Sequence, residues 1–264
     1  MPAVEEDQIE SAPMVTLPRQ VEPVKSVVQI HFPVRNMTLA YFNDQFDLRR
    51  GDLVYVDGKL EGLRGRVVDV SYNFKIKLSK YQRVVALVDT DVHGTFHLMG
   101  THFVTFHRDV LPQEKIRAWF IAPNAEDDEY VSGTNDETFA LDNLKEMHIG
   151  HEIAERGHLY YIENRVRYIS LNGNKGYALV EGSEAYEVEF EYQDGMIRNL
   201  VCGCFCSYHC KHEFAVMLQL SETLEMIKRN YAAEYEKSNY FAAVCKGTLF
   251  SFALDRKETG SITI

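Results

Sequence analysis

Residues 201–220 read VCGCFCSYHCKHEFAVMLQL, and this stretch decides how the second half of the chain folds. Four of the chain's five cysteines lie here, at Cys202, Cys204, Cys206 and Cys210. A relaxed disulfide needs Cα atoms about 5.5 Å apart with matching side-chain directions, so cysteines this crowded are poor disulfide partners for one another. The crowding therefore favours a metal site.

The best set of four ligands is Cys202, Cys204, Cys210 and His212, spaced as C-x-C, five residues, then C-x-H. Three thiolates and one imidazole are a recognised tetrahedral zinc set, so zinc is the expected cofactor. Because protein atoms fill all four positions, no position stays open for a reactive water, and the metal is expected to be structural. Cys206 is an alternative ligand, since Cys204 and Cys206 also make C-x-C, and His209 is a further candidate.

The residues on either side of the cluster predict a strand before it and a helix after it. Residues 158–171, 176–183 and 185–192 alternate with a period of two, and Gln193-Asp194-Gly195 predicts a hairpin turn into the strand that carries Cys202. Past the cluster, apolar residues recur at steps of three and four as far as about Tyr231, which predicts an amphipathic helix. The metal is thus expected to join the end of a strand to the start of a helix.

The motif C-x-C-x(n)-C-x-H, with the strands before it, resembles the SWIM zinc finger in its bacterial form. The landmarks of this resemblance, besides the four ligands, are Gly157, Tyr161, Val166, Ala178, Val180, Gly182, Ser183, Tyr186 and Val188. The resemblance implies a ββα zinc module that binds DNA or other proteins, often beside ATPase or nuclease domains. The gap between the ligand pairs is very short here and Cys206 is additional, which leaves the ligand register open. No G-x-x-x-x-G-K-[ST] loop occurs, so the chain is not itself such an ATPase.

The domain organisation follows from composition along the chain. Residues 1–25 hold four of the seven prolines and predict a flexible tail. Residues 26–123 contain short β-branched runs between Gly/Asp turn signals, which predicts a small antiparallel SH3-like β-barrel. Residues 124–137 hold six acidic and no basic residues, as expected of a linker. Residues 138–264 would form the SWIM zinc-finger domain, opening with a helix as far as Gly157 and closing with a helix and a hairpin from Thr248 to Ile264. The predicted fold class is therefore α+β, a barrel followed by a ββα zinc domain.

Charge divides the chain unevenly. The net charge of −11 has the wrong sign for a protein that coats nucleic acid with its whole surface. Residues 48–84, however, hold nine basic and four acidic residues, a local net charge of +5, so the rest of the chain carries −16. The residues of this stretch expected to contact the phosphates of DNA or RNA are Arg49, Arg64, Arg66, Lys75 and Lys77, with aromatic residues between them for stacking. An ordinary solvated face of the barrel is the alternative interpretation.

The sequence thus predicts a zinc-binding SWIM-domain protein that is not an enzyme and that binds nucleic acid, most simply DNA, as part of a larger complex. The alternative is an adaptor whose acidic surface docks a protein partner without contacting nucleic acid, and the overall charge favours it. No apolar run reaches about 18 residues and the first ten residues are acidic, unlike a signal peptide, so a cytoplasmic protein without a membrane partner is expected. No small-molecule substrate is inferred.

Overall fold

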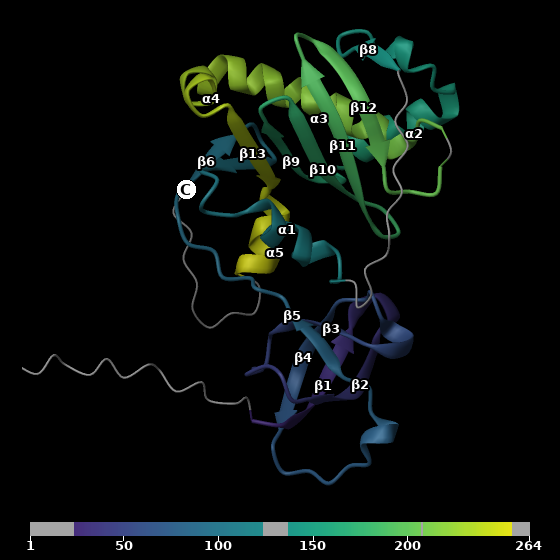
Figure 1. Cartoon of the computed structure of the whole chain (residues 1–264), viewed down its shortest axis with the longest axis vertical. Helices are drawn as coiled ribbons and strands as arrows, with labels where there is room; N and C mark the ends of the chain where they lie inside the picture. Colours follow the sequence, from purple (N-terminus) through teal and green to yellow (C-terminus); the bar gives the residue numbers. More distant parts are fainter. Residues whose placement is uncertain (1–23, 124–136, 207, 255–264) are drawn as a thin grey trace, which may run out of the picture.

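Two antiparallel sheets dominate the computed structural model, which describes residues 24–123, 137–206 and 208–254 (Figure 1). The first sheet has the strand order β2-β1-β4-β3-β5. Its strands are β1 (Ser26–Phe32), β2 (Met37–Asn43), β3 (Leu53–Val56), β4 (Gly65–Ser71) and β5 (Val84–Leu87). Buried and half-buried residues alternate along β1, so Val28, Ile30 and Phe32 point into a small core shared with β3 and β4.

The second sheet has the strand order β6-β7-β13-β9-β10-β11-β12-β8. Its strands are β6 (Phe96–Met99), β7 (Phe103–Phe106), β8 (Thr138–Ala140), β9 (Val166–Asn172), β10 (Lys175–Glu181), β11 (Ala185–Gln193), β12 (Met196–Cys202) and β13 (Tyr240–Cys245). The helices are α1 (Gln113–Phe120), α2 (His151–Ile162), α3 (Lys211–Met226), α4 (Ala232–Ser238) and α5 (Lys246–Ala253). Short helical turns lie at Pro33–Arg35, Gly58–Leu60, Leu78–Lys80, Leu144–Met147 and Ile227–Tyr231.

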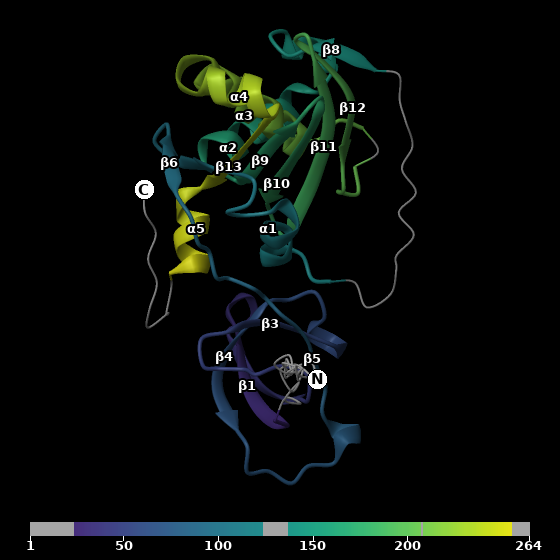
Figure 2. The same cartoon turned by 60° about the vertical axis from the view of Figure 1, so that its left-hand side comes forward.

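Helices cover both faces of the second sheet (Figures 1 and 2). On one face α3 packs against the central strands and α2 packs against α3, and Val216, Met217 and Leu220 of α3 are completely buried there. On the other face α1 and α5 lie toward the first sheet, and their shared core includes Trp119 of α1 and Tyr55 of β3. The core that contains Trp119 and Tyr55 joins the two sheets. The core on the opposite face fixes α3, whose N-terminus carries Cys210 and His212.

The elements around the cluster follow the sequence prediction. β11 and β12 form a hairpin in which Gln193 pairs with Met196, and Asp194 and Gly195 have φ angles of 51° and 85°. Such left-handed angles suit the two central residues of a type I′ turn. The helix predicted after the cluster is α3, and it continues through the turn at Ile227–Tyr231.

The predicted fold class is wrong. The described part of the chain is mostly β, neither sheet closes into a barrel, and it contains no SH3-like barrel followed by a ββα unit. β6 and β7 belong by sequence to the predicted barrel, yet β7 pairs with β13, which lies more than 130 residues further along the chain, and β13 in turn pairs with β9. The alternation of apolar and polar residues predicts that a segment is a strand, but it does not predict which strand pairs with it. Pairing between strands this far apart in the sequence could therefore not be predicted.

Two local predictions also differ from the structure. The helix expected from Glu137 to Gly157 is instead strand β8, a short turn and helix α2; Phe139 of β8 and Leu141, just after it, are both buried in the core. The hairpin expected from Thr248 begins as α5, since Leu249, Phe252 and Ala253 bury one helical face. Residues 255–264 lie outside the described residues, as do the predicted tail apart from its last two residues and the acidic linker apart from Glu137. No helix in the described ranges is long and apolar enough to cross a membrane.

Candidate metal centre

The end of one strand and the start of one helix bring the four predicted ligands together. Cys202 is the last residue of β12, Cys204 follows two residues later, Cys210 is the N-cap of α3 and His212 lies in its first turn. One donor atom from each of them lies within 4.8 Å of the donor atoms of the other three. The cluster can therefore hold a metal ion.

The spacing of the donors agrees with a tetrahedral centre. His212 Nδ1 lies 3.7 Å from Cys202 Sγ and 3.7 Å from Cys210 Sγ. Metal bonds of about 2.3 Å to sulfur and about 2.1 Å to nitrogen, at a tetrahedral angle, place those atoms about 3.6 Å apart. The observed separations thus leave room for one ion between the donors.

The start of α3 stabilises the thiolate form of Cys210. The Cys210 sulfur accepts a hydrogen bond from the Glu213 backbone N–H at 3.5 Å, and a Glu213 carboxylate oxygen accepts one from the Cys210 N–H at 2.8 Å. A hydrogen bond from the Cys202 thiol, together with His212 and this N–H, outweighs burial and lowers the pKa of Cys210 to about 4. Cys210 is therefore the cysteine of the cluster that is most easily held as a thiolate.

The other two cysteines hold their protons more strongly. Donation to Cys210 and burial raise the pKa of Cys202 well above its ordinary value. Burial, with repulsion from Cys210, raises the pKa of Cys204 to about 12. Three thiolates this close repel one another, and a bound cation offsets that repulsion, so the donor set is chemically matched to a metal cation.

Two tyrosines and a glycine enclose the histidine ligand. His212 is 4% exposed, its ring stacks on Tyr186 with centroids 4.2 Å apart, and Tyr160 packs edge-on at 5.3 Å. A Cβ at Gly182 would lie 3.6 Å from His212 Nε2 and 3.0 Å from the Tyr186 ring. Gly182 and Tyr186 were landmarks of the family resemblance. Their packing against the histidine was missed, because no spacing rule joins the β10–β11 turn to α3.

The two alternative ligands lie outside the cluster. Cys206 is exposed. His209 lies between two carboxylates, with Nδ1 3.0 Å from Glu213 and Nε2 3.0 Å from Glu137. Its hydrogen bond with Glu213 is the main cause that raises the pKa of His209. His209 therefore supports the start of α3 and does not face the sulfur atoms.

The five predicted nucleic-acid contacts separate into two groups. Arg49, Lys75 and Lys77 are exposed. Arg64 is partly buried, donates to the Trp119 carbonyl and lies over the Phe252 ring, 4.4 Å from its centroid. Arg66 donates to the Gly51 carbonyl at 2.9 Å and, like Arg64, lines a cleft between the sheets. The structure thus leaves three of the five on an open surface.

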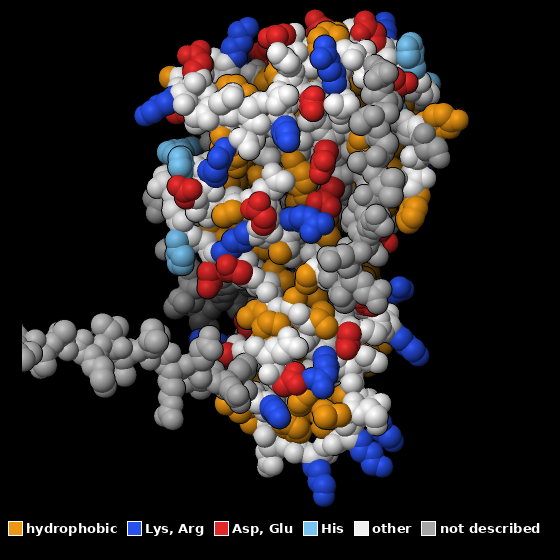
Figure 3. Space-filling view, in the orientation of Figure 1, with side chains coloured by type: hydrophobic (Ala, Val, Ile, Leu, Met, Phe, Trp, Pro, Cys, Tyr) orange, Lys and Arg blue, Asp and Glu red, His pale blue; other side chains and the backbone are white. Residues whose placement is uncertain are grey.

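The segment between β4 and β5, residues 72–83 (the β4–β5 loop), carries a group of exposed lysines. Residues 70–88 contain four basic and no acidic residues, and Lys75, Lys77 and Lys80 are exposed. Tyr72 in the same loop is 56% exposed. In Figure 3 the lowest end of the molecule, where this loop lies, shows Lys and Arg side chains and no Asp or Glu.

Comparison with known proteins finds a match over one segment of the chain. No protein-family model and no solved structure matches the chain. A segment of 71 residues is 34% identical to an uncharacterized protein, MJ1493, of Methanocaldococcus jannaschii. The matched segment is 27% of this chain and 30% of that protein, so the chain spans less than a third of the relative. The candidate functions consequently rest on the chain's own residues.

Proposed function

We propose that Cys202, Cys204, Cys210 and His212 bind one structural Zn²⁺. Three sulfurs and one imidazole nitrogen are soft to borderline donors, which select zinc over calcium or magnesium. A bound zinc would tie the end of β12 to the start of α3, and α3 is packed on the sheet by completely buried residues. The set is complete without water, which supports a protein that is not an enzyme at this centre.

The module around the zinc is proposed to be SWIM-like. The support is the ligand order along the chain together with the packing of Gly182 and Tyr186, two landmarks of that resemblance, against the histidine ligand. All five cysteines are free thiols in the structure, which agrees with a reducing compartment such as the cytoplasm.

We further propose that the protein binds nucleic acid through the β4–β5 loop. The observation that carries this proposal is the loop's charge: Lys75, Lys77 and Lys80 are exposed, and in the described part of the chain none of them forms an ion pair. Cations that the protein leaves unpaired are available to phosphates. The exposed Tyr72 adds a ring on which a base can stack.

The zinc would not contact nucleic acid in this proposal. The cluster belongs to the second sheet, and the β4–β5 loop lies at the far end of the first sheet (Figure 1). The two units would therefore act separately, the first on DNA or RNA and the second, held in shape by zinc, on the rest of a larger complex.

The experiment that tests nucleic-acid binding compares the double variant Lys75→Glu/Lys77→Glu with the control Lys237→Glu, a change on the exposed side of α4. Fluorescence anisotropy with a labelled single-stranded and a labelled double-stranded oligonucleotide would be recorded over a series of salt concentrations. The control should bind like the wild type, whereas the double variant should bind weakly and with a shallower salt dependence, by a slope of about 2. Equal binding by both variants, or no binding by the wild type at low salt, would reject the proposal.

A protein-docking function is the second candidate because two aromatic side chains are exposed in the segment between Cys204 and Cys210. Phe205 and Tyr208 lie between Cys204 and Cys210 and are 102% and 89% exposed. Aromatic residues presented this openly are frequent anchors of protein interfaces. If the chain works only as an adaptor, Phe205→Ser/Tyr208→Ser should abolish recovery of a partner while the lysine variants have no effect.

A further inference from the structure

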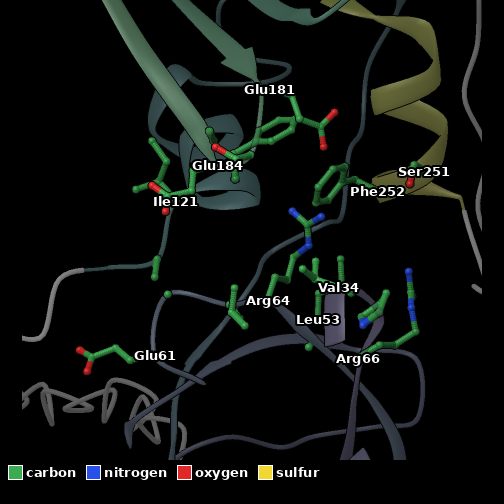
Figure 4. A pocket seen from close by; sticks show the side chains of 18 of the residues that line it. Val34, Leu53, Glu61, Arg64, Arg66, Ile121, Glu181, Glu184, Ser251 and Phe252 are labelled. Carbon is green, nitrogen blue, oxygen red and sulfur yellow. The ribbon is translucent and has the colours of Figure 1, made fainter. Parts of the chain in front are cut away.

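A cleft of about 900 Å³ separates the two sheets (Figure 4). Its lower wall comes from the first sheet and carries His31, Arg64 and Arg66, together with Glu61. Its upper wall comes from the β10–β11 turn and α5 and carries Glu184 and Phe252. A volume of this size lies within the range of sites for small organic ligands.

A stack of planar groups forms one side of this cleft. The Trp119 and Phe252 rings are nearly parallel, with an interplanar angle of 8° and centroids 4.8 Å apart. The Arg64 guanidinium also packs on Phe252, and the same guanidinium donates to the Trp119 carbonyl. Trp119 is completely buried and Phe252 is 7% exposed, so Arg64, which also lines the cleft, is the most accessible member of the stack.

Arg64 carries a charge for which the described part of the chain provides no ion pair. The nearby Glu181 is already paired with Arg167, with its carboxylate oxygen 2.7 Å from Nε of that arginine. Burying a cation without an anion is costly, and a guanidinium has five N–H donors, of which the Trp119 carbonyl takes one and the Tyr55 hydroxyl another. The lower wall therefore offers hydrogen-bond donors and positive charge to an anionic group.

The upper wall offers hydrogen-bond acceptors and a negative charge. Glu184 and the hydroxyl-bearing Ser183 and Ser251 are exposed and line the cleft. Carboxylates and hydroxyls accept hydrogen bonds from sugar hydroxyls and from exocyclic amino groups. Arginine guanidinium planes are also surfaces on which bases stack. One ligand that carries an anion, hydroxyls and a planar ring would satisfy both walls together.

We propose that this cleft binds a nucleotide. Its phosphate would contact Arg64 and Arg66, its base would pack on the outer face of the Arg64 guanidinium, and its sugar or amino groups would face Glu184. The nucleotide can be a free mononucleotide or the terminal unit of a strand, since both present the same groups. This site is separate from the β4–β5 loop, so either proposal can fail without the other.

The single tryptophan of the chain provides the test, because Trp119 lies in the stack and its carbonyl holds Arg64. Tryptophan fluorescence would be followed while ATP, GTP, adenosine or inorganic phosphate is added to the full-length protein. A saturable change is expected with a nucleotide, and a dissociation constant at least about tenfold higher with adenosine or phosphate, which each lack half of the contacts. A 5′-phosphorylated oligonucleotide, added to the Lys75→Glu/Lys77→Glu variant, distinguishes a strand end from a free nucleotide.

The cleft variants are Arg64→Gln and Glu184→Gln. Arg64→Gln should weaken nucleotide binding about tenfold or more, and Glu184→Gln by less, because the first removes a charge-assisted contact. If Arg64→Gln fails to fold, Arg66→Gln tests the same wall, since Arg66 lines the same cleft. The proposal is overturned if no nucleotide or oligonucleotide gives a saturable signal up to millimolar concentration. It is equally overturned if binding is unchanged in the Arg66→Gln and Glu184→Gln variants.

Discussion

Replacing Cys210 separates its role as a metal ligand from its role as the N-cap of α3. Serine is among the best N-cap residues, so Cys210→Ser should keep a hydrogen bond from the Glu213 N–H while removing a thiolate ligand. Alanine removes both. Two variants at one position thus distinguish loss of metal from loss of the helix cap.

The magnitudes follow from binding linkage and from the cap. At a free zinc concentration about 1,000 times the dissociation constant, bound metal stabilises the wild type by about 4 kcal/mol. For a chain of this size that corresponds to a rise in Tm of about 8–16 °C. Both variants should lose this zinc-dependent rise. Cys210→Ser should melt about 2–4 °C above Cys210→Ala, because the cap contributes about 1 kcal/mol.

The assay is thermal unfolding followed by circular dichroism, with each protein measured in buffered zinc and in chelator. Wild-type protein should respond to zinc, and both variants should give the same Tm in either buffer. A zinc-dependent rise that survives in Cys210→Ser would refute the assignment of Cys210 as a ligand. Equal Tm values for the two variants in chelator would refute the capping argument.

Three further predictions follow from the geometry of the cluster and of the second sheet. Cys206→Ser should leave zinc stoichiometry unchanged in a colorimetric zinc assay, since this exposed residue lies outside the cluster, and a loss of zinc would place it among the ligands. Gly182→Val should weaken zinc affinity about 10- to 100-fold in a chelator competition, because the new side chain crowds the histidine ligand; unchanged affinity would refute the packing argument. Burial raises the pKa of Glu187, but hydrogen bonds from Arg117 and Tyr177 lower this pKa by more, so the pKa of Glu187 lies below its ordinary value. The stability that the Glu187 carboxylate contributes is present above about pH 4.3 and is lost as the pH falls through the lower pKa of the folded state. In chelator, the Tm of Glu187→Gln should therefore fall less than the Tm of the wild type when the pH is lowered from neutral to below that pKa. Parallel curves of Tm against pH for the two proteins would contradict this prediction.

The local elements near the cluster could be predicted from sequence because short-range rules set them. The Asp194-Gly195 turn needs left-handed backbone angles, and the period of α3 comes from the residues it buries on the sheet. The ligand set could be proposed from spacing alone, since Cys202 ends a strand, Cys204 follows it by two residues and Cys210 begins a helix.

The arrangement of the sheets could not be predicted, because it depends on contacts between distant residues. β13 lies between β7 and β9 in the sheet, although about half of the chain separates β7 from β13 in the sequence. No residue pattern in Tyr240–Cys245 indicates which strands it pairs with. The surroundings of Arg64 could not be predicted for the same reason. In sequence it belongs to a basic stretch, but the packing of α1 and α5 surrounds it with Trp119 and Phe252.

The central claim is that three cysteines and one histidine hold a single zinc ion. X-ray absorption at the zinc edge of the purified protein tests it most directly, together with the zinc content of the same sample. The account predicts one zinc per chain, with three sulfur neighbours at about 2.3 Å and one nitrogen neighbour at about 2.0–2.1 Å. Four sulfur neighbours, an oxygen neighbour from water, or protein that folds fully without zinc and does not bind it would contradict the account.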